Sequence, residues 1–158
     1  MTKKLAIPWE LKADFRLRGW TSILKGFLYA IRETYGADAA LKMYERVSEM
    51  GDRHKNLTNT IRTIFKIEGN DAETIAKWFD IWLELCGYEY TILERSKTVT
   101  RFKVTKCPFK TGYEDISDWE LIFRNNISKA INPKATVERL KAMCVGDPYC
   151  EHVFKIEG

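Results

Sequence analysis

The residues with the greatest chemical potential lie near the carboxyl end of the chain. Cys144 and Cys150 flank a Gly-Asp-Pro turn that contains Asp147, and His152 follows two positions after the second cysteine. A further cysteine, Cys107, stands upstream and directly precedes a proline. Thiolates and imidazoles act as nucleophiles and bases in enzymes, and both bind zinc. Any chemistry is therefore expected at this end of the chain.

A zinc site is one interpretation of these residues. Zinc in proteins takes thiolate, imidazole and carboxylate ligands in a tetrahedron. Cys107, Cys144 and Cys150 offer three ligands, and Glu138 or His152 offers a fourth. The spacing differs from the Cys-x-x-Cys zinc knuckle, so the pattern alone does not identify a metal.

Nucleophilic catalysis is a second interpretation, with Cys107, Asp147, Cys150 and His152 as the catalytic candidates. A cysteine thiol becomes a nucleophile when a base or a positive field lowers its pKa. Cys150 and His152 would share one face of a strand, where backbones two positions apart are roughly 6–7 Å from each other. Pairing between Cys107 and His152 on different strands is easier.

A purely structural role is the third interpretation. Free cysteine is among the most buried residue types and packs as a small apolar side chain. Cys86, at the end of an apolar helical stripe, fits this role, and Asp147 can bond the backbone of its own turn. His54 is interpreted as a solvated helix residue. The residues alone leave these three interpretations open.

Apolar residues at helical spacing dominate the first half of the chain. They predict helices over residues 9–35, from residue 37 onward with Gly51 as a break, and on to about residue 67. A further helix is predicted with Asn70 as its N-cap and Glu73 completing a capping box. Its apolar stripe includes Trp78 and Trp82, which are expected in the core and could also wall an internal pocket.

After Gly87 the apolar period changes from that of a helix to that of a strand. The alternation predicts two hairpins separated by a helix, with strands over 88–92, 101–105, 136–144 and 150–156 and the helix over 116–131. Helices followed by paired hairpins are typical of an α+β fold with an antiparallel sheet. The chain is therefore predicted to be a single α+β domain over residues 1–158, in which N-terminal helices pack on the sheet.

Composition narrows the classes of partner. The chain has 158 residues with a net charge of +4, and its basic residues are dispersed rather than gathered in a patch, so nucleic acid is not expected. No apolar run approaches the roughly 18 residues of a membrane span. Four cysteines without an export signal indicate reduced thiols and a cytoplasmic location. The aromatic content of 13% suits an apolar pocket for a small organic ligand.

Three of these segments together resemble a known family. They are Cys107-Pro108 after a strand, Asn132-Pro133 after a helix, and Lys141 to Cys150 with its Gly-Asp-x-x-Cys element. They resemble the carboxyl half of the proteins labelled L-2-amino-thiazoline-4-carboxylic acid hydrolase-like. Those proteins are similar in turn to the 4-vinyl reductase type of small-molecule-binding domain. The resemblance covers about residues 70–158, and residues 1–69 agree only in being helical.

The resemblance to 4-vinyl reductase domains implies helices and an antiparallel sheet around an apolar pocket, with zinc in some members. Cys107 and Cys150 match the first and last zinc positions of that group. Ala142 stands where the middle cysteine is expected, so Cys144 is displaced by two positions, and Glu138 is a nearby candidate for the glutamate. A displacement of two keeps a strand residue on the same face.

The resemblance to the hydrolase group implies opening of a thiazoline ring by water at an amidine-like C–N bond. The chain is therefore predicted to be a small-molecule-binding protein that is also a candidate hydrolase of non-peptide C–N bonds. The alternative is a non-catalytic ligand-binding or sensor module, with or without a structural zinc. A purely structural partner subunit is a third reading, and a homodimer is left open.

Overall fold

The fold was examined in a computed structural model, which describes the backbone of residues 9–50 and 53–157 and the side chains of residues 16–50 and 53–157. The helices are α1 (Trp9–Tyr35), α2 (Ala37–Glu49), α3 (Arg53–Phe65), α4 (Ala72–Leu85) and α5 (Trp119–Ile131), with short 3-10 helices η2 (Glu114–Ile116) and η3 (Met143–Val145). The strands are β1 (Glu89–Arg95), β2 (Val99–Lys106), β3 (Ala135–Lys141) and β4 (Cys150–Ile156). The predicted α+β class is confirmed. The break predicted at Gly51 lies outside the described residues.

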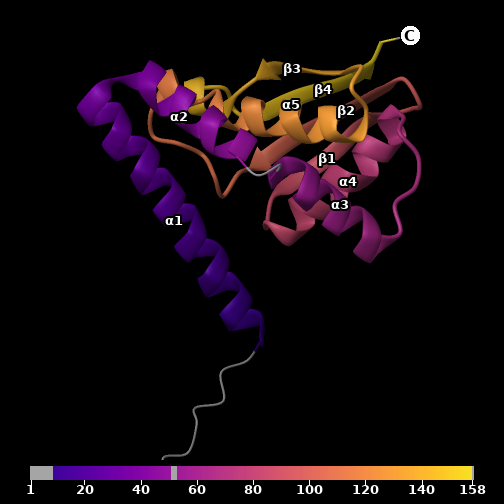
Figure 1. The fold of residues 1–158 in the computed structure, drawn as a ribbon, viewed down its shortest axis with the longest axis horizontal. Coiled ribbons are helices and arrows are strands. Elements are labelled where there is room, and N and C mark those ends of the chain that lie inside the picture. The colour runs from indigo at the N-terminus through magenta and orange to yellow at the C-terminus, as the bar shows by residue number, and fades with distance from the viewer. Residues whose placement is uncertain (1–8, 51–52, 158) are drawn as a thin grey trace, which may run out of the picture.

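The four strands form one antiparallel sheet in the order β1-β2-β4-β3. Both predicted hairpins are therefore confirmed, and their second strands pair with each other at the centre of the sheet. In this central pair Val104 lies opposite Cys150, and Phe102 lies opposite His152. Figure 1 shows α4 and α5 lying along the same side of the sheet.

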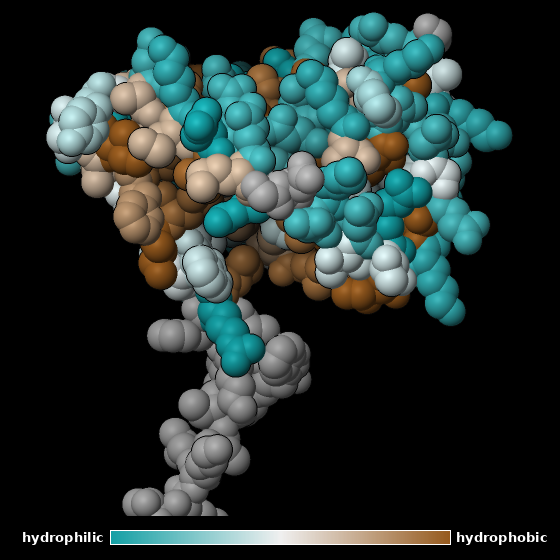
Figure 2. Space-filling model, viewed as in Figure 1, coloured by the Kyte–Doolittle hydropathy of each residue, from teal (hydrophilic) through white to brown (hydrophobic). Residues whose placement is uncertain are grey.

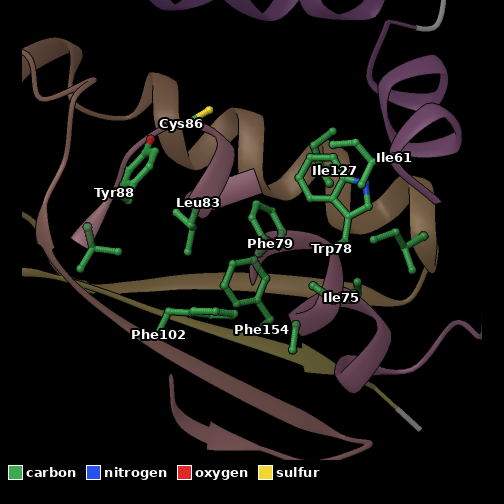
Figure 3. Packing of buried hydrophobic residues seen from close by; sticks show 14 of the residues in the cluster. Ile61, Ile75, Trp78, Phe79, Leu83, Cys86, Tyr88, Phe102, Ile127 and Phe154 are labelled. Atoms are coloured by element: carbon green, nitrogen blue, oxygen red, sulfur yellow. The ribbon is translucent and has the colours of Figure 1, made fainter. Parts of the chain in front are cut away.

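The core lies between these helices and the sheet. Phe102 and Phe154 project from neighbouring strands and are fully buried, and the ring of Phe79 on α4 lies 4.7 Å from that of Phe154, between centroids. Figure 3 shows these three rings meeting between α4 and the strands. Trp78, also on the predicted apolar stripe of α4, is fully buried as well. The apolar residues that alternate along the strands and those that recur at helical spacing on α4 thus pack together in one core.

The first turn of α4 differs from the prediction by one residue. Asp71, not Asn70, is the N-cap, because its Oδ1 accepts hydrogen bonds from the backbone N–H and the hydroxyl of Thr74, each at 2.8 Å. The backbone carbonyl of Asn70 instead accepts a bond from the side-chain amide of Asn132 at 2.7 Å. Two adjacent residues both suit an N-cap, and only the geometry of the turn selects between them.

The N-cap can be tested with two neighbouring substitutions. Asp71→Ala is expected to lower the free energy of unfolding by about 1 kcal/mol, because it removes the acceptor of an otherwise unpaired helix N–H group. Asn70→Ala is the matched control and is expected to change it by less, since its bond to Asn132 is made by the backbone. Urea unfolding measures both. An equal loss in the two variants would contradict the assignment.

The second hairpin ends its first strand earlier than predicted. β3 stops at Lys141, so Cys144 lies in a 3-10 turn and not on a strand face. The N–H groups of Val145 and Asp147 both donate to the carbonyl of Ala142, at 3.1 and 3.2 Å. Asp147 Oδ2 accepts from the N–H of Ala142 at 2.8 Å. The structural role predicted for Asp147 is confirmed, and the strand position predicted for Cys144 is wrong because this turn curls the chain.

The first helix stands apart from the rest of the fold. Figure 1 shows α1 packed beside α2 at one end and running away from the sheet at the other. It is 27 residues long, and none of the described helices is long and apolar enough to cross a membrane. Arg32 of α1 pairs with Asp115 at 2.8 Å, and the hydroxyl of Tyr29 accepts from the N–H of Gly112 at 2.8 Å. These bonds tie α1 to the segment that precedes α5.

Candidate functional site

An apolar cleft of ≈ 580 Å³ opens between α1 and the helices that cover the sheet. It is lined by residues of α1, α2, the end of α4, the segment after β2 and the start of α5: Leu17, Trp20, Ile23, Leu24, Phe27, Tyr44, Trp82, Leu85, Cys86, Tyr88, Phe109, Trp119, Glu120 and Phe123. Clefts of about 300–1,000 Å³ with mostly apolar walls and few polar groups hold small organic ligands in proteins.

The inner wall of the cleft is a set of packed aromatic rings. Trp82 lies 5.3 Å from Phe123, and Trp119 lies 5.4 Å from Tyr44 and 5.7 Å from Phe109, between ring centroids. Trp82 belongs to the apolar stripe of α4 and packs against Phe123 of α5. The stripe is predicted to wall an internal pocket, and Trp82 does line a pocket, but this pocket is a cleft open to solvent.

The outer wall is formed by α1 and is open to solvent. Trp20, Ile23 and Phe27 are 72%, 54% and 66% exposed, although all three line the cleft. Leu85, at the end of α4, is 59% exposed on the facing side. Figure 2 shows hydrophobic side chains gathered along this part of the molecule. Such a concentration of exposed large apolar side chains is typical of a ligand-binding groove or of a surface that contacts a protein or a membrane.

The floor of the cleft is polar and centres on Glu120 in the first turn of α5. Its Oε1 accepts hydrogen bonds from the hydroxyl of Tyr88 at 3.1 Å and from Nη2 of Arg124. Its Oε2 accepts from the thiol of Cys107 at 3.9 Å. Figure 3 shows the hydroxyl of Tyr88 and the sulfur of Cys86 at the edge of the core that is farther from the strands.

Burial and neighbouring charges determine the protonation of the side chains at the floor of the cleft. Burial, followed by the nearby charge of Glu120, raises the pKa of Tyr88 well above its ordinary value and raises the pKa of Cys107 in the same direction. Burial of Arg124 favours loss of its proton, but the attraction and hydrogen bond of Glu120, together with the neighbouring Tyr88 and Cys107, leave the Arg124 pKa raised. The phenol and the thiol are therefore neutral at pH 7, while the guanidinium stays charged.

The thiols near the cleft are expected to be unreactive. Burial raises the pKa of Cys86 to about 12 and raises those of Cys107 and Cys150, so little thiolate is present at neutral pH. In the native protein at pH 8, Cys86 is expected to react with a disulfide reagent about a thousandfold more slowly than in urea. Thiol titration with absorbance detection measures this rate. A fast native reaction that disappears in Cys107→Ser would instead support thiol catalysis.

The four catalytic candidates differ in their hydrogen-bond partners. Cys107 contacts Glu120, and the sulfur of Cys150 accepts from the N–H of Met143 at 3.2 Å. Asp147 is engaged in its turn, and both ring nitrogens of the buried His152 are without a hydrogen-bond partner among the described residues. In that part of the chain no hydrogen bond joins His152 to a thiol. The catalytic role of these residues stays a prediction.

The predicted zinc ligands come from different elements of the fold. Glu138 is exposed on β3 and accepts from Lys155 at 3.1 Å, whereas Cys144 lies in η3. Cys150 is buried on β4 opposite Val104 of β2. Within the described residues, no group of three or more histidine, cysteine or carboxylate side chains is arranged to hold a metal ion. Zinc binding also stays a prediction.

The fold and the cleft define an α+β domain with helices on one face of an antiparallel sheet and an apolar cleft beside α1. Its fold is similar to the phenol-responsive sensory domain of the transcription activator PoxR, solved with phenol, with a TM-score of 0.57 and 16% identity over 89% of this chain and 74% of that one. It is also similar to trafficking protein particle complex subunit 3 from Naegleria fowleri, solved covalently bound to palmitic acid. That match has a TM-score of 0.68 and 10% identity, over 92% of this chain and 97% of the other.

No protein-family model matches the chain, and no curated protein sequence does either. At these identities the similarity to the two solved structures establishes the fold alone. The resemblance to the thiazoline hydrolase-like family and to 4-vinyl reductase domains stays a prediction.

Proposed function

We propose that this protein is a non-catalytic binding module that takes a small, mainly apolar organic ligand in the cleft beside α1. The observation that carries the proposal is the cleft itself, which has a volume of ≈ 580 Å³ and a wall of aromatic and aliphatic side chains. A ligand there would cover Trp20, Ile23 and Phe27, whose exposure to water is otherwise unfavourable.

The two similar structures support this proposal by analogy. One is a sensory domain solved with phenol, and the other is a complex subunit solved with palmitic acid. Both ligands have an apolar body, although they differ greatly in length. The analogy concerns the class of ligand and does not identify the ligand of this chain.

Binding is favoured over hydrolysis because of where the reactive side chains lie. Catalysis by Cys107 needs a base within hydrogen-bond reach to form the thiolate. Its neighbour is Glu120, which is already paired with Arg124, and burial raises the Cys107 pKa. His152, the natural base, is buried on β4 and faces Arg124 and Arg139, which lower its pKa further.

A neutral fluorescent dye such as Nile red tests the proposal. Saturable binding with one site per chain is expected for the native protein. Leu24→Trp fills part of the cleft and is expected to weaken binding at least about tenfold. Leu140→Trp adds the same ring at an exposed position of β3 outside the cleft and is the matched control. Equal binding in the two variants would place the dye elsewhere and contradict the proposal.

A further inference from the structure

We infer that the cleft selects ligands whose polar head donates a hydrogen bond, that is, a hydroxyl or amino group, and that Glu120 Oε2 accepts this bond. The inference rests on the proposed function, because it assigns chemistry to one end of the ligand bound there. It names a specificity-determining residue and predicts that ligands with a carboxylate head are rejected.

The two oxygens of Glu120 differ in how fully they are used. Oε1 accepts two hydrogen bonds, from Tyr88 and Arg124. Among the described residues, Oε2 has the thiol of Cys107 as its hydrogen-bond donor, at 3.9 Å. A thiol is a weak donor, and a carboxylate oxygen accepts about two bonds. Oε2 therefore keeps capacity for a stronger donor on a residue that lines the cleft.

The carboxylate of Glu120 is held in place before a ligand arrives. Its partner Arg124 lies one turn further along α5, and its side chain is 2% exposed, compared with 13% for Glu120. Glu120 is also in the first turn of α5, where the helix dipole favours a negative charge. A fixed, charged acceptor in a cleft with apolar walls strengthens the bond to a donor on the ligand.

The negative charge of Glu120 disfavours a ligand whose head group is a carboxylate. Among the described residues that line the cleft, Glu120 is the one carboxylate, and there is no lysine or arginine. Arg124 could pair with an anion, but it is buried behind Glu120 and does not line the cleft. A carboxylate head would therefore face Glu120 at short range with little water between them, which is unfavourable. A ligand head group without a hydrogen-bond donor would displace water from Oε2 of Glu120 and leave this oxygen without a hydrogen bond.

The thiol of Cys86 does not change this assignment. It lines the cleft, but burial raises its pKa to about 12, so it remains a thiol at neutral pH. Acylation of a cysteine proceeds through the thiolate. Its reactivity towards an acylating ligand is therefore low, and the role of Glu120 rests on the hydrogen bonds and cleft lining described above.

Four ligands with one common tail test the inference on the native full-length protein. They are 1-octanol, octylamine, octyl methyl ether and octanoate. Binding of each is measured by the change in intrinsic tryptophan fluorescence, because Trp20, Trp82 and Trp119 line the cleft. The alcohol, the amine or both are expected to bind at least about tenfold tighter than the ether, as for a bond to a charged acceptor, and octanoate is expected to bind weakest. Equal affinities for all four, or tightest binding of octanoate, would overturn the inference.

Variants then assign the effect to Glu120. In Glu120→Gln, the preference of the alcohol over the ether is expected to shrink and the affinity for octanoate to rise at least about tenfold. Glu114→Gln makes the same chemical change on an exposed residue outside the cleft and is expected to keep the native order. If the loss of charge beside Arg124 impairs folding, Glu120→Gln combined with Arg124→Gln removes both charges and is compared instead. An unchanged order in the folded variant would overturn the role of Glu120.

Failure of the inference and failure of the proposed function give different results. Equal binding of the four ligands leaves the proposed function intact and overturns the inference alone. If none of the four ligands binds and Nile red does not bind either, both the proposed function and the inference are overturned.

Discussion

Glu120→Ala is expected to lower the free energy of unfolding by about 3–5 kcal/mol, the cost of leaving a buried charge without its partner. The side chain of Arg124 is 2% exposed, and its guanidinium donates to Glu120. The same substitution removes the acceptor of the Tyr88 hydroxyl. Because the Arg124 side chain is almost fully buried, its charge is expected to stay largely desolvated in the variant, and the loss is therefore large.

Two control variants separate the cost of leaving Arg124 unpaired from the general effect of removing a side chain or an exposed ion pair. Glu120→Leu combined with Arg124→Met removes both charges and is expected to be near neutral, as replacements of buried ion pairs by apolar residues often are. Glu138→Ala breaks the exposed pair with Lys155 and is expected to cost about 0–1 kcal/mol. Urea unfolding followed by circular dichroism measures all three. A loss below about 1 kcal/mol for Glu120→Ala would contradict the buried-pair account.

The order of elements could be predicted because each amphipathic segment keeps one period until a breaker residue. The stripe of α4 ends at Cys86, and the alternation that begins near Tyr88 becomes β1. Gly36 separates α1 from α2 at the predicted place, with a positive φ of 90°. The spacing of apolar residues and the residues that end a helix or strand are local properties, so they can be recognised in a single sequence.

Element ends were harder to predict because several local bonds compete for them. Asp71 and Asn70 are equally good caps by residue type, and the choice depends on which side chain meets Thr74. The end of β3 depends on how Asp147 bonds Ala142, five residues away. The alternation of apolar residues therefore predicts a strand at Cys144, although this residue lies in a turn.

The candidate site was missed for a different reason. Glu120 and Arg124 are four residues apart on a helix, a spacing that exposed ion pairs share, so the sequence does not reveal that this pair is buried. The apolar residues of α1 suggested an ordinary core helix. Only the tertiary structure shows that Trp20 and Phe27 face an open cleft rather than the sheet. The clue available in the sequence was the excess of apolar residues around α1.

His152 was the most prominent reactive residue in the sequence, and the structure gives it a different property. It is 1% exposed on β4, where it lies opposite Phe102 of β2, and its ring nitrogens have no hydrogen-bond partner among the described residues. Burial, followed by the positive charges of Arg124 and Arg139, lowers its pKa well below the ordinary value. The folded protein therefore keeps this imidazole neutral at pH values where an exposed histidine binds a proton.

The stability of the protein is accordingly expected to fall in mild acid. Below the ordinary histidine pKa of about 6.5 the unfolded chain binds a proton at His152 that the folded chain does not. The free energy of unfolding therefore decreases as pH falls, by up to about 1.4 kcal/mol per pH unit, until the lowered pKa of the folded state is reached.

His152→Leu is expected to flatten this dependence, because leucine fills the site and binds no proton. Carboxylates also titrate in this range, so the informative quantity is the difference in slope between the native protein and the variant, from urea unfolding at several pH values. His54→Gln is the matched control, since His54 is half-buried on α3 and burial lowers its pKa too, but it lies closer to solvent. It is expected to flatten the slope less than His152→Leu. Equal slopes in the native protein and His152→Leu would contradict a lowered His152 pKa in the folded state.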